Sequence, residues 1–229
     1  MGGAALASHA QPVGQRLPGA VLDWPATLRA GRLRPLALEH LRWRQGRGQA
    51  QALHVFVLDC SASMLASGAF AQAKGLLLQW LRWAYLQRTP VALLCFGAGQ
   101  VQWRLPPRRA PRCNAALIEP LHGGGGTPLA QAVHEAWALL ARRPEERRIL
   151  WLLSDFRSTD VLALARRTPP QGLSHVLVDG EQPAHAGQRA FGGALRLARA
   201  WDACAHVTLR QAGPYAWSAT ADRHPRTAA

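Results

Sequence analysis

Three short segments place oxygen-bearing side chains after apolar runs or glycines, and together they could hold a metal ion. Two carboxylates and three hydroxyls form an all-oxygen donor set, which suits a hard cation such as Mg²⁺, with Mn²⁺ as an alternative, and is ill suited to zinc. The segments are VFVLDCSASM, with Asp59, Ser61 and Ser63; GGGGT, with Thr127; and ILWLLSD, with Asp155.

The charge of this set suggests what else the site would bind. Two aspartates only balance a divalent ion, and neutral hydroxyls are weak ligands. Such a metal would accept one more anionic oxygen from outside the chain. We therefore expect an Asp or Glu of another protein to complete the site.

The elements that must position these residues alternate between strand and helix. LHVFVLD, VALLCF, ILWLLSD and LSHVLVD are short apolar runs typical of buried strands, and helical periodicity falls between them over 67–88, after Pro128, over 158–168 and over 191–202. VALLCF and VQWRLP are joined by GAGQ, a turn short enough to make only an antiparallel hairpin. The pattern predicts an α/β fold: a Rossmann-like, open, mainly parallel sheet with one antiparallel edge strand and helices on both faces.

In such a sheet, ligands bind beyond the carboxyl ends of the strands, where the strand order reverses. Asp59 and Asp155 each follow an apolar strand and should lie on that rim. If the chain stays extended after Asp59, then Ser61 and Ser63 project to the same side, because side chains alternate along a strand. Taken alone, the D-x-S-x-S segment could also be a capped turn before a helix.

The three segments resemble the metal-ion-dependent adhesion site of von Willebrand factor type A domains, which consists of D-x-S-x-S, a later Thr and a later Asp. The resemblance covers roughly residues 50–210. It implies that Asp59, Ser61, Ser63, Thr127 and Asp155 bind Mg²⁺. The flank SDF replaces the more usual TDG at Asp155, which keeps the ligand but changes its neighbours.

GGGGTPLAQAV and the basic stretch LEHLRWRQ are most similar to the C-terminal part of magnesium chelatase D subunits and related cobalt-chelatase proteins. That similarity implies a partner AAA+ ATPase and its target protein, in metal insertion into a tetrapyrrole or in cobalamin synthesis. No G-x-x-x-x-G-K-[ST] motif occurs, so we expect a separate chain to hydrolyse ATP. We assign no catalytic residue and expect a non-ATPase subunit that is not catalytic alone.

We expect a basic, partly flexible N-terminal extension at 1–48 with a short docking strand, a von Willebrand factor type A domain at 49–212 and a flexible tail at 213–229. The first twenty residues lack the apolar core of a signal peptide, and no stretch is apolar for the length of a membrane span. Four widely separated cysteines suggest buried thiols in a reducing compartment. A cytoplasmic protein without a membrane span is expected.

Three other functions compete with this hypothesis. One is an adaptor for a MoxR-type ATPase that matures another metalloenzyme. A second is nucleic-acid binding, suggested by the net charge of +14, but the arginines are scattered and form no recognition module. The third is hydrolysis with Ser61 or Ser63 as nucleophile, although neither stands in G-x-S-x-G and His122, the histidine nearest the predicted rim, is more simply a loop residue.

Overall fold

The computed structural model describes residues 20–22, 24–31, 40–45, 52–112, 115–121, 126–145, 147–182, 190–201 and 204–212. The chain divides into two compact units, Met1–Gln49 and Ala50–Ala229. Residues 1–19 of the extension expected to be partly flexible, and the whole tail expected at 213–229, lie outside the described residues.

The described residues of the first unit form a two-stranded antiparallel sheet and one α-helix. β1 (Ala20–Leu22) pairs with β2 (Trp43–Gln45), and α1 (Trp24–Gly31) lies between them in the chain. The backbone amide of Arg42 donates to the buried hydroxyl of Thr27 over 2.9 Å. A short strand therefore does form within LEHLRWRQ, and its partner is β1. Docking of this strand on the second unit stays a prediction.

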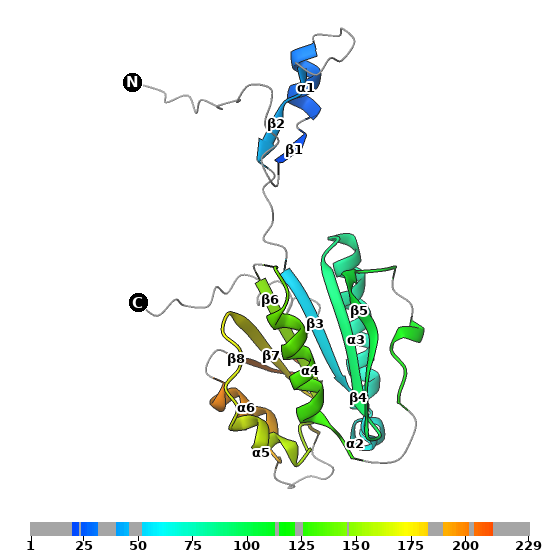
Figure 1. Ribbon diagram of the computed structural model, residues 1–229. Helices are drawn as coiled ribbons and strands as arrows, with labels where there is room; N and C mark the ends of the chain where they lie inside the picture. Colours follow the sequence, from blue (N-terminus) through cyan, green and yellow to red (C-terminus); the bar gives the residue numbers. More distant parts are fainter. Residues whose placement is uncertain are drawn as a thin grey trace, which may run out of the picture. The chain divides into compact units, whose positions relative to one another are not determined.

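The second unit is built on a six-stranded sheet with the order β5-β4-β3-β6-β7-β8 (Figure 1). All neighbours are parallel except β4 and β5. This confirms the predicted α/β architecture with one antiparallel edge strand. The strands are β3 (Ala52–Asp59), β4 (Pro90–Gly97), β5 (Gln100–Arg109), β6 (Arg147–Ser154), β7 (Leu173–Asp179) and β8 (Cys204–Thr208).

Helices cover both faces of this sheet. Alternate residues of the central strands point to opposite sides, as strand geometry requires. Phe56 and Leu58 of β3 pack with α3 (Ala69–Leu86), whereas Val55 and Val57 pack with α4 (Leu129–Ala141) and with the shorter helices α5 (Asp160–Ala165) and α6 (Gly193–Ala200). Both faces of β3 are thus buried, which explains why its sequence is apolar apart from His54 and the terminal Asp59.

The connection between β4 and β5 is a tight hairpin. Its two loop residues, Ala98 and Gly99, have φ angles of 51° and 71°. Consecutive positive φ angles are typical of the two-residue turns that match the twist of antiparallel strands. The hairpin expected at GAGQ is therefore confirmed.

The single helix expected over 67–88 is confirmed as α3, but a short helix that was not expected, α2 (Ala62–Ala66), precedes it. Gly68 separates the two helices with a φ of 74°, a conformation that favours glycine. In the described part of the chain, no helix is long and apolar enough to cross a membrane.

Candidate metal centre

The candidate residues belong to the central strands of the sheet. β4, which follows β3 in the chain, lies on one side of β3, and β6 lies on the other. Strand order therefore reverses between β3 and β6, the position where open parallel sheets bind ligands. Asp59 is the last residue of β3, and Asp155 directly follows β6. Since these strands are parallel neighbours, both aspartates lie at the same edge of the sheet.

The carboxylate of Asp59 is almost completely buried, with 1% of the residue exposed. Its Oδ1 accepts the backbone N–H of Ser61 over 2.8 Å, and its Oδ2 accepts the hydroxyl of Ser154 over 2.5 Å. A carboxylate offers about four lone-pair positions, so these two bonds leave capacity for another ligand. The bonds also hold the carboxylate in one orientation.

Burial raises the pKa of Asp59 to about 6. The hydrogen bonds from Ser154 and Ser61 act in the opposite direction, whereas the negative charge of Asp155 raises this pKa further. Asp155 is itself 5% exposed. At neutral pH, two carboxylates therefore share a poorly hydrated region, an arrangement that a cation would stabilise.

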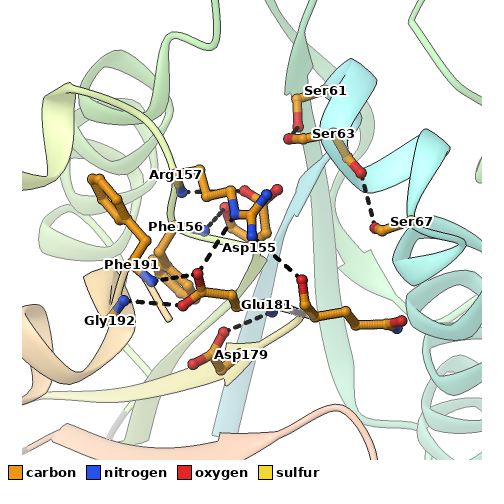
Figure 2. A network of polar contacts seen from close by, with 12 residues as sticks. Ser61, Ser63, Ser67, Asp155, Phe156, Arg157, Asp179, Glu181, Phe191 and Gly192 are labelled. Atoms are coloured by element: carbon orange, nitrogen blue, oxygen red, sulfur yellow. Dashed lines mark hydrogen bonds and ion pairs between the residues drawn. The ribbon is translucent and has the colours of Figure 1, made fainter. Parts of the chain in front are cut away.

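Ser61 and Ser63 do not lie on an extended strand, so the expected continuation of the strand through 59–63 is wrong. The chain turns into α2 at Ala62, and Ser61 occupies the N-cap position with φ −64° and ψ 159°. The Ser61 hydroxyl makes no capping bond and instead lies 3.1 Å from the hydroxyl of Ser63 (Figure 2). The two hydroxyls therefore still point to one side, but the first turn of α2 brings them together and not the alternation of side chains along a strand.

Asp155 starts the loop between β6 and α5. Its Oδ1 accepts the backbone N–H of Arg157 over 3.2 Å. The intervening Phe156 is buried and has a φ of 52°, an uncommon conformation for a residue other than glycine. The Ser154 hydroxyl accepts the N–H of Phe156 over 2.9 Å, so this bent loop is tied to the same serine that donates to Asp59.

Thr127 is half-buried and lies just before α4. Its carbonyl oxygen accepts the hydroxyl of Ser158 over 3.0 Å, which brings its segment against the loop that carries Asp155. On the other side, the carbonyl of Gly126 accepts the N–H of Gly99 from the β4–β5 hairpin over 2.7 Å. His122 and residues 123–125, most of the glycine run, lie outside the described residues.

The structure thus joins four of the five candidate residues through direct interactions and places Thr127 by its backbone. Hydrogen bonds connect Ser63, Ser61 and Asp59 in series, and Asp155 acts on Asp59 through its charge. Among the described residues, no group of three or more His, Cys, Asp or Glu side chains could hold a metal. The candidate centre depends instead on two carboxylates supplemented by hydroxyls, a donor set compatible with Mg²⁺ or Mn²⁺.

Ser154 was not among the predicted site residues, yet its hydroxyl links the ends of β3 and β6. The sequence could have indicated Ser154 because it is a hydroxyl residue at the last position of an otherwise apolar strand. Only the pairing of β3 with β6 reveals that its partner is Asp59. Glu181, which is central to the network in Figure 2, was not predicted either. The carboxylate of Glu181 lies 3.5 Å from the Arg157 guanidinium and accepts the N–H groups of Phe191 and Gly192.

The histidines with described partners are engaged away from the two serines. Trp151 donates to His54 over 3.0 Å, and Trp137 donates to His175 over 2.9 Å, both within the core. His206 lies 3.3 Å from Asp179. The geometry of these histidines gives no support to a serine–histidine hydrolase at this position.

Comparisons with known proteins agree with this architecture. The family model described as von Willebrand factor type A domain matches residues 54–157, a range that includes all five candidate residues. The magnesium-chelatase 67 kDa subunit of Chlorobaculum parvum is 32% identical over 133 residues, which cover 57% of this chain and 21% of that subunit. The 67 kDa subunit of Heliobacterium mobile is 29% identical over 159 residues, which cover 61% and 24% respectively.

The chain therefore spans about a quarter or less of the length of these relatives. Among solved structures, an aerotolerance-related membrane protein from Bacteroides fragilis superposes with a TM-score of 0.53 at 15% identity, covering 76% of this chain and all of that one. This similarity concerns the fold alone. Residues 54–157 therefore match the von Willebrand factor type A domain family, and the chain is similar to segments of magnesium-chelatase subunits.

Proposed function

We propose that the chain is a Mg²⁺-dependent protein–protein interaction subunit. Asp59, Ser61, Ser63, Thr127 and Asp155 would hold the ion, with Mn²⁺ able to replace it. The observation that carries the proposal is the burial of two neighbouring carboxylates where the strand order reverses, with the pKa of Asp59 raised to about 6. Without a cation, this arrangement is electrostatically unfavourable at neutral pH.

The chain's own residues would prepare the site for the ion. The Ser154 hydroxyl and the Ser61 amide orient Asp59, and the Arg157 amide orients Asp155. When bound, the metal would supply a positive charge that still attracts one anionic oxygen, because two carboxylates only neutralise it. An Asp or Glu of the partner would provide that oxygen.

The partner in this proposal is a separate AAA+ ATPase, acting with its target protein. The relatives described above are named as subunits of magnesium chelatase, which supports a chelatase-type complex. The reaction would be insertion of magnesium or cobalt into a tetrapyrrole, or metal insertion in cobalamin synthesis, with the inserted metal as substrate. This chain would contribute regulated docking and no catalytic residue of its own.

The second candidate is an adaptor for a MoxR-type ATPase in the maturation of another metalloenzyme. The observation that favours this second candidate is the limited extent of the similarity, which covers only 21% of the Chlorobaculum parvum subunit and is compatible with a different client protein. The two candidates share the metal site and differ in the client protein.

The metal site is tested by calorimetric titration of the chain with Mg²⁺ and Mn²⁺. We expect one ion to bind and Asp59→Ala to abolish binding. Glu119→Ala, which removes an exposed carboxylate elsewhere, is the matched control and should bind like the unmodified chain. Equal affinity in Asp59→Ala would contradict the proposed ligand.

The partner is tested by affinity purification with the tagged chain in Mg²⁺ and in EDTA. Recovery of an AAA+ ATPase with a chelatase subunit, lost in EDTA and in Asp59→Ala, would support the first candidate. Recovery of a MoxR-type ATPase with another metalloenzyme would support the second. Recovery of the same proteins in EDTA would contradict docking through the metal.

A further inference from the structure

Two hydrogen bonds connect the segment that carries Thr127 to the loop that carries Asp155. The Ser158 hydroxyl donates to the carbonyl oxygen of Thr127 over 3.0 Å, and the N–H of Ala130 donates to Oδ2 of Asp160 over 3.0 Å. These contacts join positions about 30 residues apart in the chain. They are the closest described connection between the two candidate ligand segments.

The bond to Asp160 replaces a missing helix cap. α4 begins after Pro128 and has no side-chain cap from its own N-cap residue. The first amides of a helix need an acceptor, and a carboxylate there also interacts favourably with the helix dipole. Asp160, which lies on α5, supplies that acceptor to Ala130 in the first turn of α4.

The two bonds support each other. The N–H of Asp160 donates to the Ser158 hydroxyl oxygen over 3.2 Å while that hydroxyl donates to Thr127. The loop is anchored at its other end as well, because the amide of Arg157 donates to Asp155. A displacement of Ser158 or Asp160 would therefore change the distance between Thr127 and Asp155.

We propose that Ser158 and Asp160 are positioning residues that hold Thr127 at the correct distance from Asp155 for metal binding. This inference depends on the metal site proposed above. The two residues act through backbone groups of the Thr127 segment and are not themselves metal ligands. The required property at each position is specific: a hydroxyl at 158 and a hydrogen-bond acceptor at 160.

The test compares Mn²⁺ affinity, measured by calorimetry or by the electron paramagnetic resonance of free Mn²⁺, in alanine and conservative variants of the full chain. Ser158→Ala and Asp160→Ala should each weaken binding about 10-fold, the loss typical of groups that orient metal ligands. Ser158→Thr and Asp160→Asn should retain an affinity close to that of the unmodified chain, because each keeps the hydroxyl or the acceptor.

Glu135→Ala is the matched control. Its carboxylate lies on α4 and accepts only from Gln131 among the described hydrogen bonds, on the exposed face of the helix. Circular dichroism checks that each variant folds, and if Asp160→Ala does not, Ser158→Ala decides the result. Unchanged Mn²⁺ affinity in the alanine variants would overturn the inference. An equal loss in Asp160→Asn would also overturn it, because Asp160 would then act through its charge.

A second measurement does not require metal. Hydrogen exchange of the Ala130 amide should become faster in metal-free Ser158→Ala and Asp160→Ala, and remain slow in the conservative variants. If the unmodified chain binds no Mn²⁺, the proposed function fails and takes the role in metal binding with it, and exchange then tests only the connection between the two segments. Unchanged exchange in the alanine variants would refute the connection between the two segments.

Discussion

Asp59→Asn is expected to stabilise the metal-free protein while it abolishes metal binding. The pKa of Asp59 is raised from 3.8 to about 6, chiefly by burial. The folded state therefore holds a proton on Asp59 at pH values where the unfolded chain has released it. Each pKa unit corresponds to 1.36 kcal/mol, so ionised Asp59 costs the folded state about 3 kcal/mol at pH 7.5.

The sign of this effect can be followed with pH. Between pH 3.8 and about 6, the folded protein binds more protons at Asp59 than the unfolded chain does, so this group makes stability fall as pH rises. Above pH 6 the full cost is present. An asparagine keeps an acceptor for the Ser61 amide and carries no charge, so Asp59→Asn should recover about 1 to 3 kcal/mol at pH 7.5.

The assay is equilibrium urea unfolding in EDTA at pH 7.5, with Glu119→Gln as control for loss of an exposed carboxylate. Excess Mg²⁺ should then stabilise the unmodified chain, because a ligand that binds only the folded state adds to its stability, and should leave Asp59→Asn unchanged. A variant that is less stable than the unmodified chain in EDTA would refute the reasoning, since Asp59 would then be contributing stability through its hydrogen bonds.

The remaining predictions concern the core and the loop after β6. Burial lowers the pKa of His54 to about 3, with a further contribution from Arg147, and lowers that of His175 to about 4. Both histidines are neutral in the folded state, so the free energy of unfolding falls as the pH drops below 6.5. At pH 5 each histidine lowers the free energy of unfolding by about 2 kcal/mol, while protonation of Asp59 restores about 1 kcal/mol. Urea unfolding at pH 7.5 and pH 5 should show a net loss of about 3 kcal/mol, and a flat profile would disprove it. Gly193→Ala would place a Cβ 2.2 Å from the Phe156 carbonyl oxygen and should lower the stability measured by thermal unfolding by at least about 2 kcal/mol. Gly75→Ala lies inside α3, where a Cβ would meet nothing within 4 Å, and should stabilise the protein by roughly 0.5 to 1 kcal/mol. Equal effects of the two substitutions would contradict the close packing at Gly193.

Part of the fold follows directly from local sequence. LHVFVLD is apolar apart from His54 and Asp59 because both faces of β3 are covered, and the short turn at GAGQ allows only an antiparallel hairpin. Aspartates at the ends of two such strands can be recognised without coordinates, since parallel strands in one sheet bring their carboxyl ends to one edge. The residue types of the candidate site, two carboxylates and three hydroxyls, are likewise visible in the sequence.

Other features depend on contacts between distant segments. The periodicity over 67–88 indicates α3 but does not reveal α2, which lies before this range and is separated from α3 by Gly68. The sequence also did not reveal that the chain turns into α2 at Ser61, because a hydroxyl-rich segment after a strand is compatible with extended and capped conformations alike. Local sequence preferences do not distinguish the extended from the capped conformation here, and tertiary packing determines which one forms.

The sequence by itself determined the alternating α/β pattern and the kinds of side chain at the strand ends. Only the tertiary structure decided that β6 pairs with β3, which places Ser154 against Asp59 although the two are 95 residues apart. The raised pKa of Asp59 and the bonds from Ser158 and Asp160 have the same origin. Burial and hydrogen-bond geometry arise from atoms that distant segments bring together, and no local pattern encodes those distances.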